Sequence, residues 1–380
     1  MKLKKKTEKA ILSVSDFRKP EIKVIENNSV AEVSEKEMPK EVLSTTNLDF
    51  ENLWRKASDI DDKCHDYTVY CHKIQGDELP DFCVDFTKEG VRVACDSKDE
   101  NYRITHHLVF ISPFALGQLA AKLGVPMRYV NKCADAGFFE LANRNFNDWL
   151  ENYDKPLFVR QYEKTIRGIL TPRYSCFDTL DILSVVDDCM NMDNFNIKGH
   201  LVNEERFHAR FISKELLPVS GEDLYGGVFI DSSDVGRSVL TVTFGIFKQV
   251  CTNGLMIAKD KGVLFQQKHI GITSHEFKKG FIAALGNFDV MCKNSVKFIN
   301  ECRSAKISLA TKEDTERFIR NLQSNVNMSK ESAEKVIDLM NNRYGATRWG
   351  MINGITEVAQ DFTLERRLEL EKFAGEILIA

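Results

Sequence analysis

The sequence lacks the long apolar run that a membrane-spanning helix requires. No stretch of about 18 apolar residues occurs in its 380 residues. The apolar stretch behind the basic first residues, Ala10-Ile11-Leu12, is too short for a signal peptide. The ten cysteines are scattered along the chain and include no CxxC pair. We therefore expect a cytoplasmic protein that has no membrane partner and keeps its cysteines as free thiols.

A strong positive charge is missing as well. Lys and Arg total 52 against 56 Asp and Glu, which gives a net charge of −4 and a pI of about 6.1. Proteins that bind nucleic acid over most of their surface usually carry a marked basic excess. Any nucleic-acid site in this protein is therefore expected to be local, because only the field within a groove matters there.

The common catalytic motifs are absent too. The chain has no phosphate loop of the form GxxxxGK(S/T) and no GxGxxG after a predicted strand. It has no GxSxG elbow and no HExxH helix. These absences favour a protein that is not an enzyme, without deciding the question. We expect no cofactor.

Three constellations offer metal ligands or a nucleophile. Cys64-His65 and Cys71-His72 contain zinc-type ligands, but adjacent side chains point apart and the spacing matches no common zinc module. Of His106-His107 on a predicted strand, only one can face a given side. Cys251 ends a predicted strand, where His269 could approach it as a base. For all three, a structural role is favoured over metal binding or catalysis.

The hydrophobic periodicity predicts an α+β fold. Apolar and polar residues alternate at 82–86 and 90–95, which indicates a hairpin, and Ser112-Pro113 is typical of a helix start. Between 156 and 255, short connections surround a helix at Asp178–Cys189, so a β-β-α-β-β-β-like core with a mainly antiparallel sheet and packed helices is expected. No proline follows Pro218, and residues 275–380 have helical spacing.

These patterns divide the chain into four parts. Residues 1–50 are poor in large apolar residues and predict a disordered tail. Residues 51–155 form an N-terminal hairpin with helices, 156–305 a central α+β core, and 306–380 a helical C-terminal region. In the last part, Trp349, Asn353, Thr356 and Glu357 share one helix face, for which docking on the core is slightly favoured over a subunit contact.

Basic and aromatic residues interleave on the predicted strands of the central core. Alternate residues on a strand share a face, so such a sheet could follow a phosphate backbone and stack bases. The bland alternative, a solvated sheet face with arginines lying along it, is somewhat favoured. The candidate nucleic-acid-binding residues are Arg160, Tyr162, Lys164, Arg167, Arg173, Tyr174, Arg206, Arg210, Arg237 and Lys248.

Four stretches in the second half of the chain carry a family resemblance. They are Leu170–Ser175, Ser232–Leu240 with Gln249–Leu255, Lys268–Gly271, and Ala346–Gly350 with Asn353–Glu357. In order and spacing these stretches resemble the phage/plasmid-like proteins grouped as domain of unknown function 932. The resemblance implies intracellular work connected with mobile DNA, and it transfers no catalytic residue.

A second resemblance concerns topology. The predicted strand and helix order of residues 156–247 is similar to the core of single-strand annealing proteins from phage recombination, which bind single-stranded DNA and often form rings. The first hypothesis is therefore a mobile-element protein that binds or anneals single-stranded DNA in recombination, as a homo-oligomer. The second is an interaction protein that neutralises a host defence protein. The third is a nuclease-like enzyme.

Overall fold

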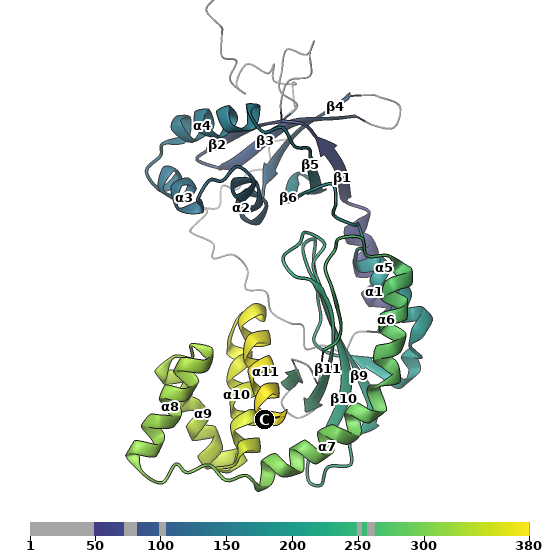
Figure 1. Ribbon diagram of the computed structural model, residues 1–380, viewed down its shortest axis with the longest axis vertical. Coiled ribbons are helices and arrows are strands. Elements are labelled where there is room, and N and C mark those ends of the chain that lie inside the picture. Colours follow the sequence, from purple (N-terminus) through teal and green to yellow (C-terminus); the bar gives the residue numbers. More distant parts are fainter. Residues whose placement is uncertain (1–48, 72–81, 99–103, 249–252, 257–262, 380) are drawn as a thin grey trace, which may run out of the picture. The chain divides into compact units, whose positions relative to one another are not determined.

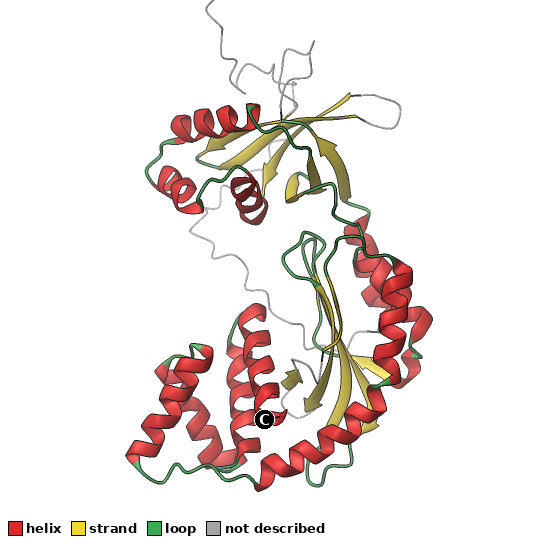
Figure 2. Ribbon diagram, in the orientation of Figure 1, coloured by secondary structure: helices red, strands yellow, loops and turns green. Residues whose placement is uncertain are grey.

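The computed structural model describes residues 49–71, 82–98, 104–248, 253–256 and 263–379 (Figure 1). The chain divides into two compact units. Among the described residues, the first comprises 66–169 and the second 49–65 together with 170–379. No helix in the described ranges is long and apolar enough to cross a bilayer. Helices and strands are both abundant, and the helices dominate after residue 273 (Figure 2).

The first unit is built on a six-stranded sheet with the strand order β1-β5-β6-β4-β3-β2. The β2–β3 and β3–β4 pairs are antiparallel, whereas β4 and β6 run parallel. The strands are β1 (Cys64–Val69), β2 (Phe82–Thr87), β3 (Gly90–Lys98), β4 (Ile104–Ile111), β5 (Leu157–Tyr162) and β6 (Thr165–Leu170).

Three helices complete the first unit, and their apolar residues share one core with the sheet. They are α2 (Pro113–Lys122), α3 (Met127–Asp135) and α4 (Phe139–Glu151). The predicted start of α2 is confirmed, because the Ser112 hydroxyl accepts a hydrogen bond from the Ala115 amide at 3.1 Å.

Helix α4 closes one edge of this sheet with two asparagines. Asn147 accepts a hydrogen bond from the Val84 amide at 2.8 Å and donates one to the Val84 carbonyl at 2.9 Å. One turn earlier, Asn143 accepts from the Phe86 amide and donates to the Phe86 carbonyl. The outer backbone groups of β2 at these positions are thus satisfied by side chains.

The second unit contains a seven-stranded sheet in which all described pairs are antiparallel. Its main path runs β12-β11-β10-β9-β7, with β13 beside β11 and β8 beside β9. The strands are β7 (Phe195–Ile197), β8 (Leu201–Val202), β9 (Phe207–Leu216), β10 (Leu224–Ser232), β11 (Leu240–Lys248), β12 (Asn253–Met256) and β13 (Val263–Gln267).

Helices cover both faces of the second sheet. In Figure 1, α1, α5 and α6 lie along one side and α11 along the other. The helices are α1 (Phe50–Asp61), α5 (Thr179–Cys189), α6 (Ser274–Gly286), α7 (Phe288–Ser304), α8 (Lys312–Val326), α9 (Lys330–Leu339), α10 (Arg348–Val358) and α11 (Leu364–Ile379). Short 3-10 turns occupy Met192–Asn194 and Ala359–Asp361, and a π-helix occupies Met340–Tyr344.

The predicted fold class is confirmed, and one part of the predicted topology changes. The chain is α+β with mainly antiparallel pairing and a helical C-terminal region. The strands and the helix expected from residue 156 onward are present in the expected order. However, β5 and β6 complete the first sheet, whereas the strands after α5 form the second. The β-β-α-β-β-β-like run is therefore divided between two sheets.

The polar face predicted on α10 is buried. Trp349, Asn353 and Thr356 are each at most 6% exposed, and the Asn353 side chain donates to the Trp349 carbonyl at 2.8 Å. Glu357 lies at the border of this face and pairs with Arg343 at 2.9 Å. The docking interpretation of this helix is thus confirmed.

Candidate functional site

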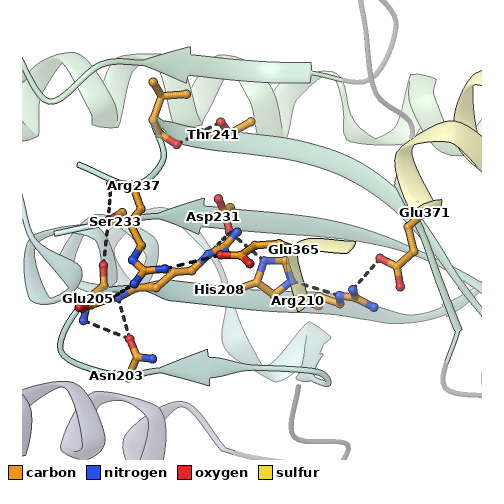
Figure 3. Close-up of polar contacts among 12 residues, drawn as sticks. Asn203, Glu205, His208, Arg210, Asp231, Ser233, Arg237, Thr241, Glu365 and Glu371 are labelled. Carbon is orange, nitrogen blue, oxygen red and sulfur yellow. Dashed lines mark hydrogen bonds and ion pairs between the residues drawn. The ribbon is translucent and has the colours of Figure 1, made fainter. Parts of the chain in front are cut away.

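The sheet face beneath α11 carries a chain of charged residues, which is buried at Arg210 and Glu371 and reaches solvent at Glu365 (Figure 3). Along β9, Phe207, Ala209 and Phe211 point into an apolar core with α5 and α6. Because side chains alternate across a strand, His208 and Arg210 point to the opposite face, where Figure 3 shows Arg210 directed toward Glu371 of α11. This alternation places ionisable groups between a sheet and a helix.

The first link joins β9 to α11. The Arg210 guanidinium donates to one Glu371 carboxylate oxygen at 2.7 Å, and both side chains are at most 1% exposed. Arg367, one turn earlier on α11, donates from Nε to the other oxygen at 2.9 Å. Glu371 therefore compensates two buried arginines. The ring of Phe229 lies under the Arg210 guanidinium at 5.1 Å.

The second link fixes the tautomer of His208. Arg210 Nε donates to His208 Nε2 at 3.2 Å, so this ring nitrogen is an acceptor. The ring proton is then on Nδ1, which lies 3.4 Å from the Asp231 carboxylate and donates toward it. Burial lowers the pKa of His208, and nearby Arg210 lowers it further against the pull of Asp231. His208 is therefore held as the neutral imidazole at pH 7.

The chain continues to the sheet end through Asp231 of β10. Arg206 contacts the Asp231 carboxylate at 3.1 Å and Glu365 at 3.4 Å. Burial alone would raise the pKa of Asp231, but the bonds to His208 and Arg206 outweigh it and the pKa is lowered. Arg237 then joins Glu365 at 3.7 Å and Glu205 at 2.6 Å.

We call this network the charge chain, and its formal positive and negative charges cancel. It joins four arginines with four carboxylates through the neutral His208. Its members are Arg206, Arg210, Arg237, Arg367, Glu205, Asp231, Glu365, Glu371 and His208. His208 is fully buried, so a substrate could not reach it as a general base in this conformation. The geometry instead assigns the chain a structural task, which is to hold α11 on the sheet.

A second cluster lies at the same end of the sheet. The rings of Tyr174 and His269 stack with centroids 5.3 Å apart and planes inclined by 9°. The Tyr174 hydroxyl donates to the Ser233 carbonyl at 2.9 Å, and His269 Nε2 lies 3.0 Å from the Ser232 hydroxyl. Ser232 and His269 are 0% and 4% exposed, so this pair does not offer a nucleophile at the surface.

Exposed residues surround this cluster. Arg173, next to Tyr174, and Lys268, next to His269, are both exposed, and Ile270 is 61% exposed. Three of the four stretches singled out in the sequence thus meet in space, namely 170–175, 232–240 and 268–271. We call the group formed by Arg173, Tyr174, Lys268 and Ile270 the loop patch.

Several predicted nucleic-acid-binding residues are not on an open face. Arg160 is 1% exposed and is held by the Asp66 carboxylate through hydrogen bonds of 2.8 and 3.1 Å, and Arg167 is 2% exposed. Arg206 and Arg210 are buried in the charge chain. The prediction of a solvated sheet face is therefore wrong for these arginines, because carboxylates from other elements bury Arg160, Arg206 and Arg210.

The remaining predicted residues are divided between the two units. Tyr162, half-buried, and Lys164, exposed, belong to the β5–β6 hairpin of the first unit. In the second unit, Arg173 is exposed and Tyr174 half-buried, Arg237 ends the charge chain, and Lys248 pairs with Glu222 at 2.9 Å. The carboxylates of Glu365 and Glu371 were missed by sequence reasoning, although Arg367 four residues before Glu371 is a local signal for that pair.

The metal and nucleophile candidates remain apart from these clusters. Within the described ranges, no group of three or more His, Cys, Asp or Glu side chains could hold a metal ion. Cys64 is half-buried and Cys71 buried, while His72 and Cys251 lie outside the described residues. The backbones of His106 and His107 pair with β3 opposite Asp96 and Cys95.

A family model decides the relationship of the chain to known proteins. The model described as Domain of unknown function (DUF932) matches residues 167–372, more than half of the sequence. The protein belongs to the DUF932 family. Its DUF932 region begins in β6 and ends in α11, so it contains the whole charge chain and the loop patch. No curated protein and no solved structure matches the chain.

Proposed function

We propose that this DUF932 protein binds single-stranded DNA through the loop patch, and that it serves the recombination of mobile DNA in the cytoplasm without a cofactor. The observation that carries the proposal is the pairing of two exposed cations with an ordered ring. Arg173 and Lys268 have no ion-pair partner among the described residues, unlike Arg237 of the charge chain. Their charge is therefore available to phosphates.

The ring of Tyr174 is held before any ligand arrives. One face is stacked on His269, and the hydroxyl is bonded to the Ser233 carbonyl. Stacking of a base on an ordered ring costs less entropy than stacking on a mobile side chain, because the ring does not have to be immobilised on binding. Such stacking contributes about 1–3 kcal/mol per base and tolerates any sequence. Annealing would need a second strand or subunit, and we expect a homo-oligomer.

The proposal is tested by fluorescence anisotropy with single-stranded and duplex DNA at two salt concentrations, with the mass of the protein measured alongside. We expect single-strand-selective binding that weakens with salt. The double variant Arg173→Glu/Lys268→Glu should bind at least about tenfold more weakly. Its salt slope should be smaller by roughly 0.7 for each phosphate that the variant no longer neutralises.

The matched control is Lys279→Glu/Lys293→Glu, which makes the same change in net charge at exposed positions of α6 and α7. This control should bind DNA like the natural protein. Equal losses in both double variants would indicate an effect of overall charge, and absent or salt-independent binding to single strands would overturn the proposal.

A second candidate function is docking on a host defence protein. The net charge of −4 suits protein docking better than DNA affinity. On β4 of the first unit, Leu108 and Phe110 are 58% and 42% exposed and share one sheet face. This function predicts a stable complex with a defence protein, no affinity for nucleic acid, and loss of the complex in Leu108→Ser/Phe110→Ser. The third hypothesis, a nuclease-like enzyme, would need metal-dependent turnover that one acidic substitution abolishes.

A further inference from the structure

A cavity of about 850 Å³ lies in the second unit, away from the loop patch. One wall is the segment 216–223 that connects β9 to β10, and the other is formed by Lys248, Arg343, Tyr344 and Trp349. We call this cavity the Glu222 groove. Lys248 and Trp349 adjoin or belong to two of the stretches that resemble the family, 249–255 and 346–357.

Two hydrogen-bond donors and one ammonium group, from three elements, converge on one carboxylate in this groove. Arg303 of α7 and Trp349 of α10 donate to Glu222 Oε1 at 2.9 and 2.8 Å. Lys248, at the end of β11, lies 2.9 Å from Glu222 Oε2. Arg303 also donates to the Ser220 carbonyl at 2.7 Å, so both of its terminal nitrogens hold the connecting segment.

The wall opposite the segment has an unusual backbone. Arg343 and Tyr344 belong to the π-helix Met340–Tyr344, a conformation that is rare and often found at functional sites. The turn after it is tight, because a Cβ atom on Gly350 would lie 1.9 Å from the Gly345 carbonyl oxygen. Lys248 and Arg343 both lie about 5 Å from the centre of the Tyr344 ring. The Tyr344 ring thus brings Arg343 close to Lys248, which is itself one of the three groups that contact Glu222.

We propose that the Glu222 groove binds a phosphoryl anion, and that Glu222 is an internal occupant which the ligand displaces. A carboxylate has two oxygens, and here Oε1 is shared by Arg303 and Trp349. A phosphoryl group has three, one for each of Arg303, Trp349 and Lys248. Once the segment moves, the nitrogen of Arg303 that holds Ser220 becomes available, and a guanidinium fork matches two phosphoryl oxygens.

Glu222 lowers the apparent affinity of the natural protein for the phosphoryl anion. The open groove is only fractionally populated while Glu222 is in place, and the apparent affinity for a ligand falls by that fraction. Removal of the carboxylate should therefore strengthen phosphate binding, whereas loss of a purely structural ion pair would only destabilise the fold. The inference stands independently of DNA binding at the loop patch.

The test is calorimetric titration of the full chain with inorganic phosphate and, separately, with a nucleoside monophosphate at constant ionic strength. Glu222→Ala should bind phosphate at least about tenfold more tightly than the natural protein, and Arg303→Gln added to it should remove the gain. Asp187→Ala, at an exposed acid of α5 that does not line the groove, should leave the affinity unchanged. Tighter binding of the monophosphate than of phosphate would assign the ligand to nucleotides, and equal binding to the free anion.

A second measurement needs no variant. In hydrogen exchange on the natural protein, amides of residues 216–223 should exchange faster in phosphate than in chloride of equal ionic strength. The Arg173→Glu/Lys268→Glu variant should show the same response, which separates this site from the loop patch. Unchanged exchange, or a folded Glu222→Ala protein without tighter phosphate binding, would overturn the proposal.

Discussion

The two faces of the second sheet are both buried, but the face toward α11 carries buried charges beside the apolar residues Phe229, Leu364 and Leu368. Toward α5 and α6, β9 and β10 present Phe207, Phe211 and Ile230 to an apolar core. Toward α11, the same strands present Arg210 and Asp231 to the charge chain. The same sheet is thus covered by apolar packing on one face and by ion pairs beside apolar residues on the other.

The two faces should differ in how well they tolerate substitutions. Apolar burial is non-directional, so a slightly smaller side chain gives up only its own packing and leaves a small cavity. A buried charge depends on a particular partner, since removal of that partner leaves an uncompensated ion in a poorly solvating interior. We therefore expect the charged face to respond to single substitutions more strongly than the apolar face, and to respond to pH.

The largest effect is expected at Glu371. Glu371→Ala leaves Arg210 and Arg367 without their shared carboxylate and should lower the free energy of unfolding by about 3–5 kcal/mol in urea denaturation. The double variant Arg210→Met/Glu371→Met should cost at least about 1 kcal/mol less than the sum of its single variants, because it removes one of the two arginines that Glu371→Met leaves without their shared carboxylate. If the losses in free energy of unfolding were additive, Arg210 and Glu371 would not depend on each other, and the charged face would respond to substitution like the apolar face.

A smaller effect is expected on the apolar face. Ile230→Val removes one methylene from the core beneath α6 and should cost about 0.5–1.5 kcal/mol. The loss should be the same at pH 5.5 and pH 7.5, as it involves no ionisable group. A loss as large as that of Glu371→Ala would contradict the comparison.

The smallest effect is a pH dependence of the charged face. Burial holds the pKa of His208 below its unfolded value of about 6.5, so between these two values the unfolded chain binds the extra proton. The stability that neutral His208 contributes to the fold is fully present above about pH 6.5. It is lost as the pH falls from there toward the lower pKa of His208 in the folded protein. His208→Gln keeps an acceptor for Arg210 and a donor for Asp231, and it should flatten the decline of urea stability from pH 7 to pH 5.

The control for this prediction is His275→Gln, at an exposed position of α6. It should leave the pH profile unchanged. A profile that His208→Gln does not alter would show that other groups cause the acid sensitivity of the fold.

The sequence predicted the strands between α5 and the end of β11 because their signals are local, but it did not predict β12 and β13. The helix from Asp178 and the alternation of β9 follow from neighbouring residues, and the structure has both. The same alternation indicated a solvated basic face, which was wrong for Arg206 and Arg210, since Glu365 and Glu371 reach them from α11 about 160 positions away. Short-range periodicity distinguishes two faces, but it does not reveal whether a distant helix covers the polar one.

The loop patch was predicted only in part for a similar reason. Arg173 and Tyr174 follow from their own hairpin region, whereas the sequence offers His269 only as a possible partner of Cys251 and as part of the stretch Lys268–Gly271, without its contact to Tyr174. Its stacking on Tyr174 depends on the bridge between residues 174 and 270, which joins two segments far apart in the chain. No spacing rule in the sequence reports such a contact.

The asparagines of α4 have a consequence for how copies of this chain can associate. A bare edge strand invites another chain to add its own strand, a route to ordered fibres and to aggregates. Asn143 and Asn147 already occupy the outward amide and carbonyl groups of β2 at Phe86 and Val84. A helix thus imitates the neighbouring strand, and a growing β-ribbon would first have to peel α4 from this edge.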